Sequence, residues 1–235
     1  MMKAAPKWVT VLFALSLALN LWFAGVPDWR WIPAALAGWY VADLMSGLTH
    51  MYMDYRLCTP GIGLSDMFHY TGSRESADYQ ALRARVLPRI SPFERLVYDF
   101  KNHHPRPEAL GRRTFLVQIG STIIFFALPA SLLLNVACRF VPLPGWLVFG
   151  VAVLIAGGTL AQYFHGTLHR TDNPWIVHAM RRVGLLMTPE AHALHHATLR
   201  RDFATNTGWS NPLVNLIFRA AISRGWLTEA GLEPS

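Results

Sequence analysis

Charged residues are scarce in this chain. Only 15% of its 235 residues are Asp, Glu, Lys or Arg, whereas 52% are hydrophobic, and the mean hydropathy is +0.25. Soluble domains average about 25% charged residues. The composition therefore excludes an ordinary soluble domain and predicts a membrane protein.

Cysteine is nearly absent, since Cys58 and Cys138 are the only two. The topology predicted below puts them toward opposite membrane faces, so we expect neither a disulfide between them nor a thiolate metal site. The sequence also contains no HExxH, which leaves the zinc-protease arrangement with its glutamate base unsupported.

The excess of basic residues does not indicate nucleic-acid binding. The formal net charge is +7, but the arginines are dispersed beside apolar runs and no RNA- or DNA-binding motif occurs. Membrane topology and anionic lipid headgroups account for the charge better. We therefore expect no nucleic-acid partner.

Four apolar runs are long enough to cross about 30 Å of hydrocarbon. They predict an all-α integral membrane protein with a single domain, residues 1–235, and four transmembrane helices at about 8–26, 31–53, 115–137 and 146–164. A cleaved signal peptide is the alternative for the first run. That run is long for such a peptide, however, and no A-x-A site follows it.

The distribution of Lys and Arg predicts the orientation of the spans. The N-terminus, residues 55–113 and the tail from residue 170 hold two, ten and seven of them, whereas the turns at 27–30 and 139–145 hold one each. By the positive-inside rule both termini are cytoplasmic. Residues 55–113 and 170–235 then form a cytoplasmic cap.

Histidines occur in four clusters, all on the predicted cytoplasmic side. The second apolar run ends at His50, and the fourth ends at a pair spaced four apart; a polar segment carries an adjacent pair, and the tail carries three on one predicted helix face. The set is His50, His103, His104, His165, His169, His192, His195 and His196. Ionisable groups at membrane depth mark functional sites by default.

These clusters suit a metal centre. Neutral imidazole binds Fe, Zn, Cu and Ni, and eight histidines imply two ions, since one ion rarely needs more than four protein nitrogens. A dinuclear centre at a bilayer face, beside apolar helices that can hold a lipid tail, suits O2-dependent attack on an unactivated C–H bond. We expect Asp43, Asp54 and Gln162 to orient ligand imidazoles by hydrogen bonds, without binding metal themselves; a helix–helix hydrogen bond is the alternative for Asp43.

Five sequence blocks together resemble the Kua/CarF lipid desaturases, over about residues 38–218. They are Ala42-Asp43-x-x-Ser46-Gly47-x-x-His50-x-x-x-Asp54, Phe100-Lys101-x-His103-His104-x-x-Pro107, Gln162-x-x-His165-x-x-x-His169, Pro189-Glu190-x-His192-x-x-His195-His196 and Thr207-Gly208-Trp209-x-Asn211. The last block is more similar to the plasmanylethanolamine branch of the family than to the chloroplast acyl-lipid branch. Leu199-Arg200-Arg201 and Phe203-Ala204 depart from the pattern of that branch.

The resemblance implies a four-span desaturase whose eight histidines bind two Fe ions. Such an enzyme uses O2 and two electrons from a cytochrome b5 or ferredoxin-type donor. On a plasmanyl (alkyl ether) phospholipid it forms the vinyl ether of a plasmenyl lipid. The alternatives are an acyl-lipid desaturase, a hydroxylase with the same centre, and a non-enzymatic membrane protein that binds metal or localises a partner.

Overall fold

The computed structural model describes residues 4–235, and its regular elements within that range are all helical, which confirms the predicted all-α class. In chain order they are α1 (Lys7–Ala24), α2 (Trp31–Tyr55), α3 (Leu64–Phe68), α4 (Ala77–Val86), η1 (Leu87–Arg89), α5 (Pro92–His103), α6 (Glu108–Gly111), α7 (Phe115–Thr122), η2 (Ile123–Ala127), α8 (Leu128–Phe140), α9 (Gly145–Leu168), α10 (Trp175–Arg182), α11 (Pro189–Thr198), α12 (Asn211–Ser223) and η3 (Glu229–Gly231).

Three helical segments are long and apolar enough to cross a membrane. They are Lys7–Ala24, Phe115–Phe140 and Gly145–Leu168; the second comprises α7, the π-helical turn η2 and α8. Helix α2 has 25 residues, but its polar side chains make it less apolar than these three. Four spans were predicted, so the fourth, at α2, stays a prediction.

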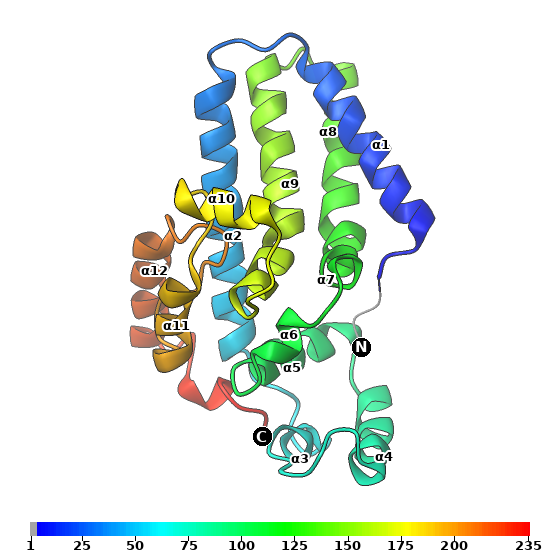
Figure 1. Ribbon diagram of the computed structural model, residues 1–235, viewed down its shortest axis with the longest axis vertical. Coiled ribbons are helices and arrows are strands. Elements are labelled where there is room, and N and C mark those ends of the chain that lie inside the picture. The colour runs from blue at the N-terminus through cyan, green and yellow to red at the C-terminus, as the bar shows by residue number, and fades with distance from the viewer. Residues whose placement is uncertain (1–3) are drawn as a thin grey trace.

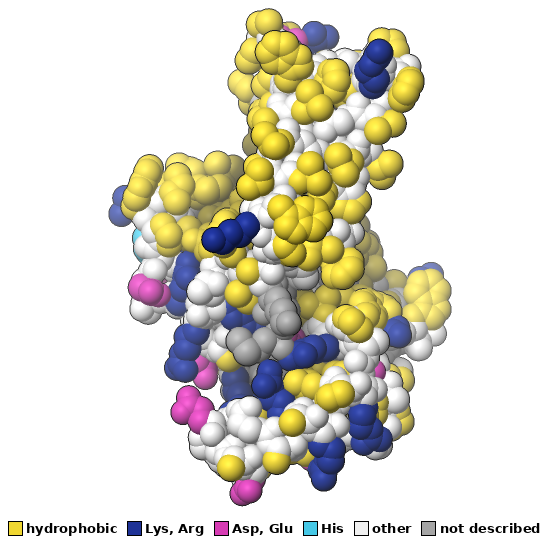
Figure 2. Space-filling model, turned by 90° about the vertical axis from the view of Figure 1, so that its right-hand side faces the viewer, with side chains coloured by type: hydrophobic (Ala, Val, Ile, Leu, Met, Phe, Trp, Pro, Cys, Tyr) yellow, Lys and Arg dark blue, Asp and Glu magenta, His cyan; other side chains and the backbone are white. Residues whose placement is uncertain are grey.

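The long helices stand side by side in one part of the molecule, and the short helices gather around its other end (Figure 1). Hydrophobic side chains cover most of the upper part of the face in Figure 2, whereas Lys and Arg side chains concentrate in the lower part. This separation is typical of a protein with one part in hydrocarbon and another in contact with headgroups and water.

Glycines bring α2 and α9 into close contact. A Cβ atom added at Gly38 would lie 2.2 Å from the carbonyl oxygen of Gly150, and one added at Gly157 would lie 2.8 Å from the Cβ of Ala42. Small residues let two helix backbones approach in this way. As a result, the imidazoles of His50 and His165 lie with their ring centroids 4.8 Å apart.

Hydroxyl side chains cap the N-terminal ends of α5 and α11, the two short helices that carry histidines. The Ser91 hydroxyl accepts a hydrogen bond from the Glu94 N–H at the start of α5 (3.1 Å). The Thr188 hydroxyl accepts one from the Ala191 N–H at the start of α11 (3.4 Å). In both helices Pro follows the capping residue, because Pro is tolerated in the first turn and the preceding hydroxyl satisfies a free N–H.

Candidate metal centre

The structure brings all eight predicted histidines together in two adjacent groups. They come from four helices: α2, the C-terminal end of α5, the C-terminal end of α9, and α11. Most of the rings are buried, the exceptions being the half-buried His104, His169 and His196.

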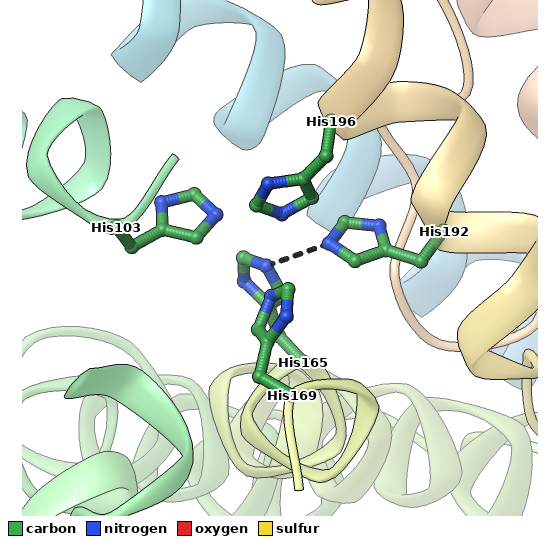
Figure 3. Close-up of side chains that lie close together, drawn as sticks. All are labelled: His103, His165, His169, His192 and His196. Carbon is green, nitrogen blue, oxygen red and sulfur yellow. Dashed lines mark hydrogen bonds between the residues drawn. The ribbon is translucent and has the colours of Figure 1, made fainter. Parts of the chain in front are cut away.

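The first group contains only histidines. One ring nitrogen from each of five residues lies within 4.8 Å of the others, and the residues are His103, His165, His169, His192 and His196. Figure 3 shows these rings converging on a common space. The Nε2 atoms of His165 and His192 are 3.1 Å apart.

The second group is centred on a carboxylate. Asp54 Oδ2 lies 3.4 Å from His50 Nε2 and 3.3 Å from His195 Nε2, and Asp54 Oδ1 lies 3.3 Å from His104 Nε2. Asp54 was expected to orient imidazoles from outside the centre. Its position among the inward-facing nitrogens also qualifies it as a ligand.

The donor atoms of both groups fit metal ions. Within residues 4–235, the following buried atoms have no hydrogen-bond partner: His50 Nε2, His103 Nε2, His104 Nε2, His169 Nε2, His192 Nδ1, His195 Nε2, His196 Nε2 and both carboxylate oxygens of Asp54. Leaving so many buried polar atoms unpaired is costly. Two ligand atoms that bind the same ion at about 2 Å lie about 3 to 3.4 Å from each other. The distances between His165 and His192 and between Asp54 and its three histidines match this.

Backbone carbonyls fix the tautomers of three rings. The carbonyl oxygen of Phe203 lies 2.9 Å from His50 Nδ1, and that of Arg201 lies 2.9 Å from His195 Nδ1. The carbonyl of Phe100 bonds to His103 Nδ1. A carbonyl only accepts, so Nδ1 carries the proton and the lone pair of Nε2 points inward. Sequence reasoning looked for carboxylates in this role and missed these carbonyls, which have no signature in the side-chain sequence.

Burial keeps the imidazoles outside the spans neutral. Burial, followed by the neighbouring imidazoles, lowers the pKa of His169 to about 4 and that of His196 to about 3. The pKa values of His103 and His192 are also well below the usual range for the same reasons. Neutral imidazole is the form that binds a metal.

Asp43 does not take the orienting role that was expected of it. Its Oδ1 accepts hydrogen bonds from the N–H groups of Thr207 (2.7 Å) and Gly208 (3.1 Å). Its Oδ2 accepts from the N–H (2.9 Å) and the hydroxyl (2.7 Å) of Ser210. Asp43 thus joins α2 to the loop before α12. The same loop begins near Phe203, whose carbonyl bonds to His50.

Gln162 likewise makes no hydrogen bond to an imidazole in the described part of the chain. It lies instead in the wall of an apolar cavity of about 340 Å³ between α2, α9 and the α7–η2 segment. The cavity wall includes His50 and His165, one from each group, and both are only 2% exposed. Phe125, which is 78% exposed, also lines the cavity. An alkyl chain in this space would reach both groups.

Lys101 is a buried residue to which sequence reasoning gave no role. Its Nζ donates hydrogen bonds to the carbonyls of Met53 (3.1 Å), Asp54 and Gly231, and burial lowers its pKa to about 8. A cation at the C-terminal end of a helix satisfies its free carbonyls. Lys101 therefore ties α5 to the end of α2 directly beside Asp54.

Comparisons with known proteins identify a lipid desaturase family. Residues 93–221 match the family model described as the lipid desaturase domain, a range that contains all the clustered histidines except His50. The chain is 25% identical over 227 residues to a plasmanylethanolamine desaturase from Myxococcus xanthus, covering 94% of this chain and 69% of that protein. No solved structure gives a significant match.

Proposed function

Since the chain belongs to the lipid desaturase domain family, we propose that it is a membrane-bound dinuclear-iron oxidoreductase that converts plasmanyl phospholipids into plasmenyl phospholipids. The observation that carries this proposal is the composition of the apolar cavity wall. His50 and His165, one from each histidine group, line the same cavity, so an alkyl chain bound there lies against both proposed iron sites.

The proposed reaction removes two hydrogens from neighbouring carbons of the alkyl ether chain. One O2, two electrons and two protons are consumed with each –O–CH2–CH2– unit, which becomes –O–CH=CH–, and two waters form. A one-electron carrier of the cytochrome b5 or ferredoxin type supplies the electrons. Bound iron supplies the oxidising power for breaking an unactivated C–H bond.

The side chains of this protein hold the irons and shield the reacting carbon. In this proposal one iron is bound by His103, His165, His169, His192 and His196, and the other by His50, Asp54, His104 and His195. The carbonyls of Phe100, Arg201 and Phe203 keep three rings in the required tautomer. The apolar cavity positions the chain and excludes water, which prevents side reactions of the oxidant.

The proposed arrangement in the membrane has four spans in one domain, with α2 as the fourth. Support comes from its length and its close packing along α9. The Lys and Arg distribution of the sequence favours both termini, and with them the centre, on the cytoplasmic side. In this orientation the polar residues of α2 face α9 and the cap instead of lipid.

The ether-lipid substrate is supported by the name of the Myxococcus xanthus relative and by the Thr207-Gly208-Trp209-x-Asn211 block. The test is lipid mass spectrometry of cells that express the wild type or His165→Ala, fed an alkyl-ether lipid under air. A product lighter by two hydrogens and labile to acid, formed only by the wild type, is the expected result.

Other products would redirect the assignment. An unchanged ether pool with new unsaturated acyl chains would indicate an acyl-lipid desaturase, and a product heavier by one oxygen would indicate a hydroxylase. If the wild type retains its metal but changes no lipid, the enzymatic proposal fails and a non-enzymatic metal-binding role gains support.

A further inference from the structure

A second cavity, of about 150 Å³, lies in the cap and is rich in arginine. Its wall includes the guanidinium groups of Arg74, Arg83, Arg95 and Arg113 and a single carboxylate, that of Asp99. Four positive groups around one negative group repel one another. The excess of positive charge therefore favours binding of an anion in this cavity.

Only two of these arginines have their main contacts inside the protein. Arg113 pairs with Asp99 at 3.1 Å, and Arg74 donates to the Met67 carbonyl at 2.8 Å. In the part of the chain that the structure describes, the side chains of Arg83 and Arg95 make no hydrogen bond or ion pair, and the Nε of Arg95 is buried without a partner. An unpaired buried donor on a cation is costly unless a ligand satisfies it.

A small polar cavity lies between this arginine cavity and the apolar one, and shares wall residues with each. It has a volume of about 20 Å³, room for about one water molecule. Asp99, Asn102 and Arg113 line both the small cavity and the arginine cavity, whereas Gln162 and His165 line both the small cavity and the apolar cavity. The three cavities thus run in series along α5, from apolar through polar to basic.

We propose that the arginine cavity binds the phosphate of the phospholipid whose alkyl chain occupies the apolar cavity. This inference rests on the proposed function. The order of the cavities matches the order of groups in such a lipid: chain, oxygen-bearing glycerol, phosphate. Guanidinium groups bind phosphate oxygens in pairs, with charge-assisted hydrogen bonds, and Arg83 and Arg95 have these donors free.

The position of the phosphate has a consequence for the reacting carbons. With the phosphate held in the cap and the chain in the apolar cavity, the first carbons of the chain lie beside the histidine groups. The small cavity between them has room for about one water molecule, so binding of the glycerol there has to widen it. A reaction at the two carbons next to the ether oxygen needs this placement. A site that bound the chain without the headgroup would leave the position along the chain undetermined.

A concave cavity also favours a small anion over a protein surface. The acidic face of an electron carrier is broad and does not enter a cavity of this size, whereas a phosphate group does. We therefore assign the cavity to the lipid and treat an acidic donor protein as an outcome of the test.

The test compares Arg83→Gln, Arg95→Gln and the double variant with the wild type and with Arg85→Gln, a control at an exposed arginine on the same helix α4. The substrates are a 1-O-alkyl-2-acyl-glycerophosphoethanolamine and the 1-O-alkyl-2-acyl-glycerol with the same chains and no phosphate. One lost charge-assisted hydrogen bond corresponds to about a tenfold effect. We expect the kcat/KM ratio of phospholipid to phosphate-free lipid to fall about tenfold in each single variant, through KM, with Arg85→Gln unchanged.

Binding of the same two lipids to the purified iron-loaded protein gives a readout that does not depend on turnover. The wild type should prefer the phospholipid, the Gln variants should lose that preference, and Arg95→Lys should restore part of it. Equal losses for both lipids would overturn the inference, as would a defect that appears only when the electron donor is limiting, which would assign the cavity to an acidic donor. Phospholipid-selective binding without dehydrogenation would contradict the proposed function while supporting the phosphate site.

Discussion

At the residue scale, Asp43 and Asp54 show how two carboxylates of one helix acquire different roles. Both side chains are fully buried. The oxygens of Asp43 accept four hydrogen bonds from one loop, whereas those of Asp54 accept none and face three imidazole nitrogens. A buried carboxylate needs compensation in either case. For Asp43 the loop supplies it, and for Asp54 the proposed metal ion would supply it.

Replacing Asp54 by Asn should therefore remove metal. The amide has nearly the same shape but no charge, so the ion shared with His50, His104 and His195 loses its only anionic ligand. We expect Asp54→Asn to bind about one iron fewer per chain than the wild type, as measured by inductively coupled plasma mass spectrometry of the reconstituted protein. Full iron content in the variant would show that Asp54 is not a ligand.

The matching change at Asp43 should lower the stability of the fold more than it lowers iron binding. In Asp43→Asn the amide NH2 group would face N–H donors of the loop, and charge-assisted bonds would be lost, at a cost of about 2 to 4 kcal/mol. We expect a lower melting temperature, with iron content per folded chain close to that of the wild type. An unchanged melting temperature would contradict the role of Asp43 as the anchor of the loop.

At the element scale, the contact between α2 and α9 brings the two histidine groups together. A side chain at Gly38 meets the α9 backbone, so Gly38→Leu should push the helices apart, lower stability by about 3 kcal/mol or more and reduce iron binding. Ala37→Leu is the matched control, because Ala37 is exposed. Thermal unfolding and iron content of both variants test this, and equal effects at the two positions would contradict it.

The helical elements and the eight histidines were predictable from the sequence, because helix caps, apolar length and spacing of three or four residues are local signals. Contacts between distant segments were not. Asp43 lies on the same face of α2 as His50, so the sequence indicates that its carboxylate orients the imidazole. Instead, Asp43 bonds to a loop more than 160 positions away. From the sequence, Lys101 is expected to be an exposed charge. In the structure it is buried, because the end of α2 and the C-terminal segment pack around it.

The loop after α11 contributes to the candidate centre through its backbone. Arg201 and Phe203 contribute backbone carbonyls to His195 and His50, a role that does not depend on their side chains. The ring of Phe203 has a second role, because it is fully buried and packs against His195 and Phe218. Leu199 and Asp202 adopt positive φ angles of 54° and 60°, which turn the chain so that these carbonyls point inward. A backbone role of this kind cannot be read from side-chain patterns.

At the scale of the whole molecule, the candidate metal centre lies where the long helices meet the cap. Its donors come from α2, α5, α9 and α11, whereas α1 and α8 are held by their own polar contacts, such as the bond between the hydroxyls of Ser16 and Ser131 (2.7 Å). Loss of metal should therefore loosen the cap and leave the contact between α1 and α8 intact.

Removing iron with a chelator should accordingly lower the melting temperature by several degrees, because a ligand that binds only the folded state stabilises it. Hydrogen exchange followed by mass spectrometry should become faster in α5 and α11, where unpaired imidazoles would admit water, and stay unchanged in α1. Adding Fe(II) back should restore protection, whereas Mg2+ should not, since imidazole is a poor ligand for it. Faster exchange spread evenly over all helices would mean that the centre supports the whole fold instead of joining its two parts.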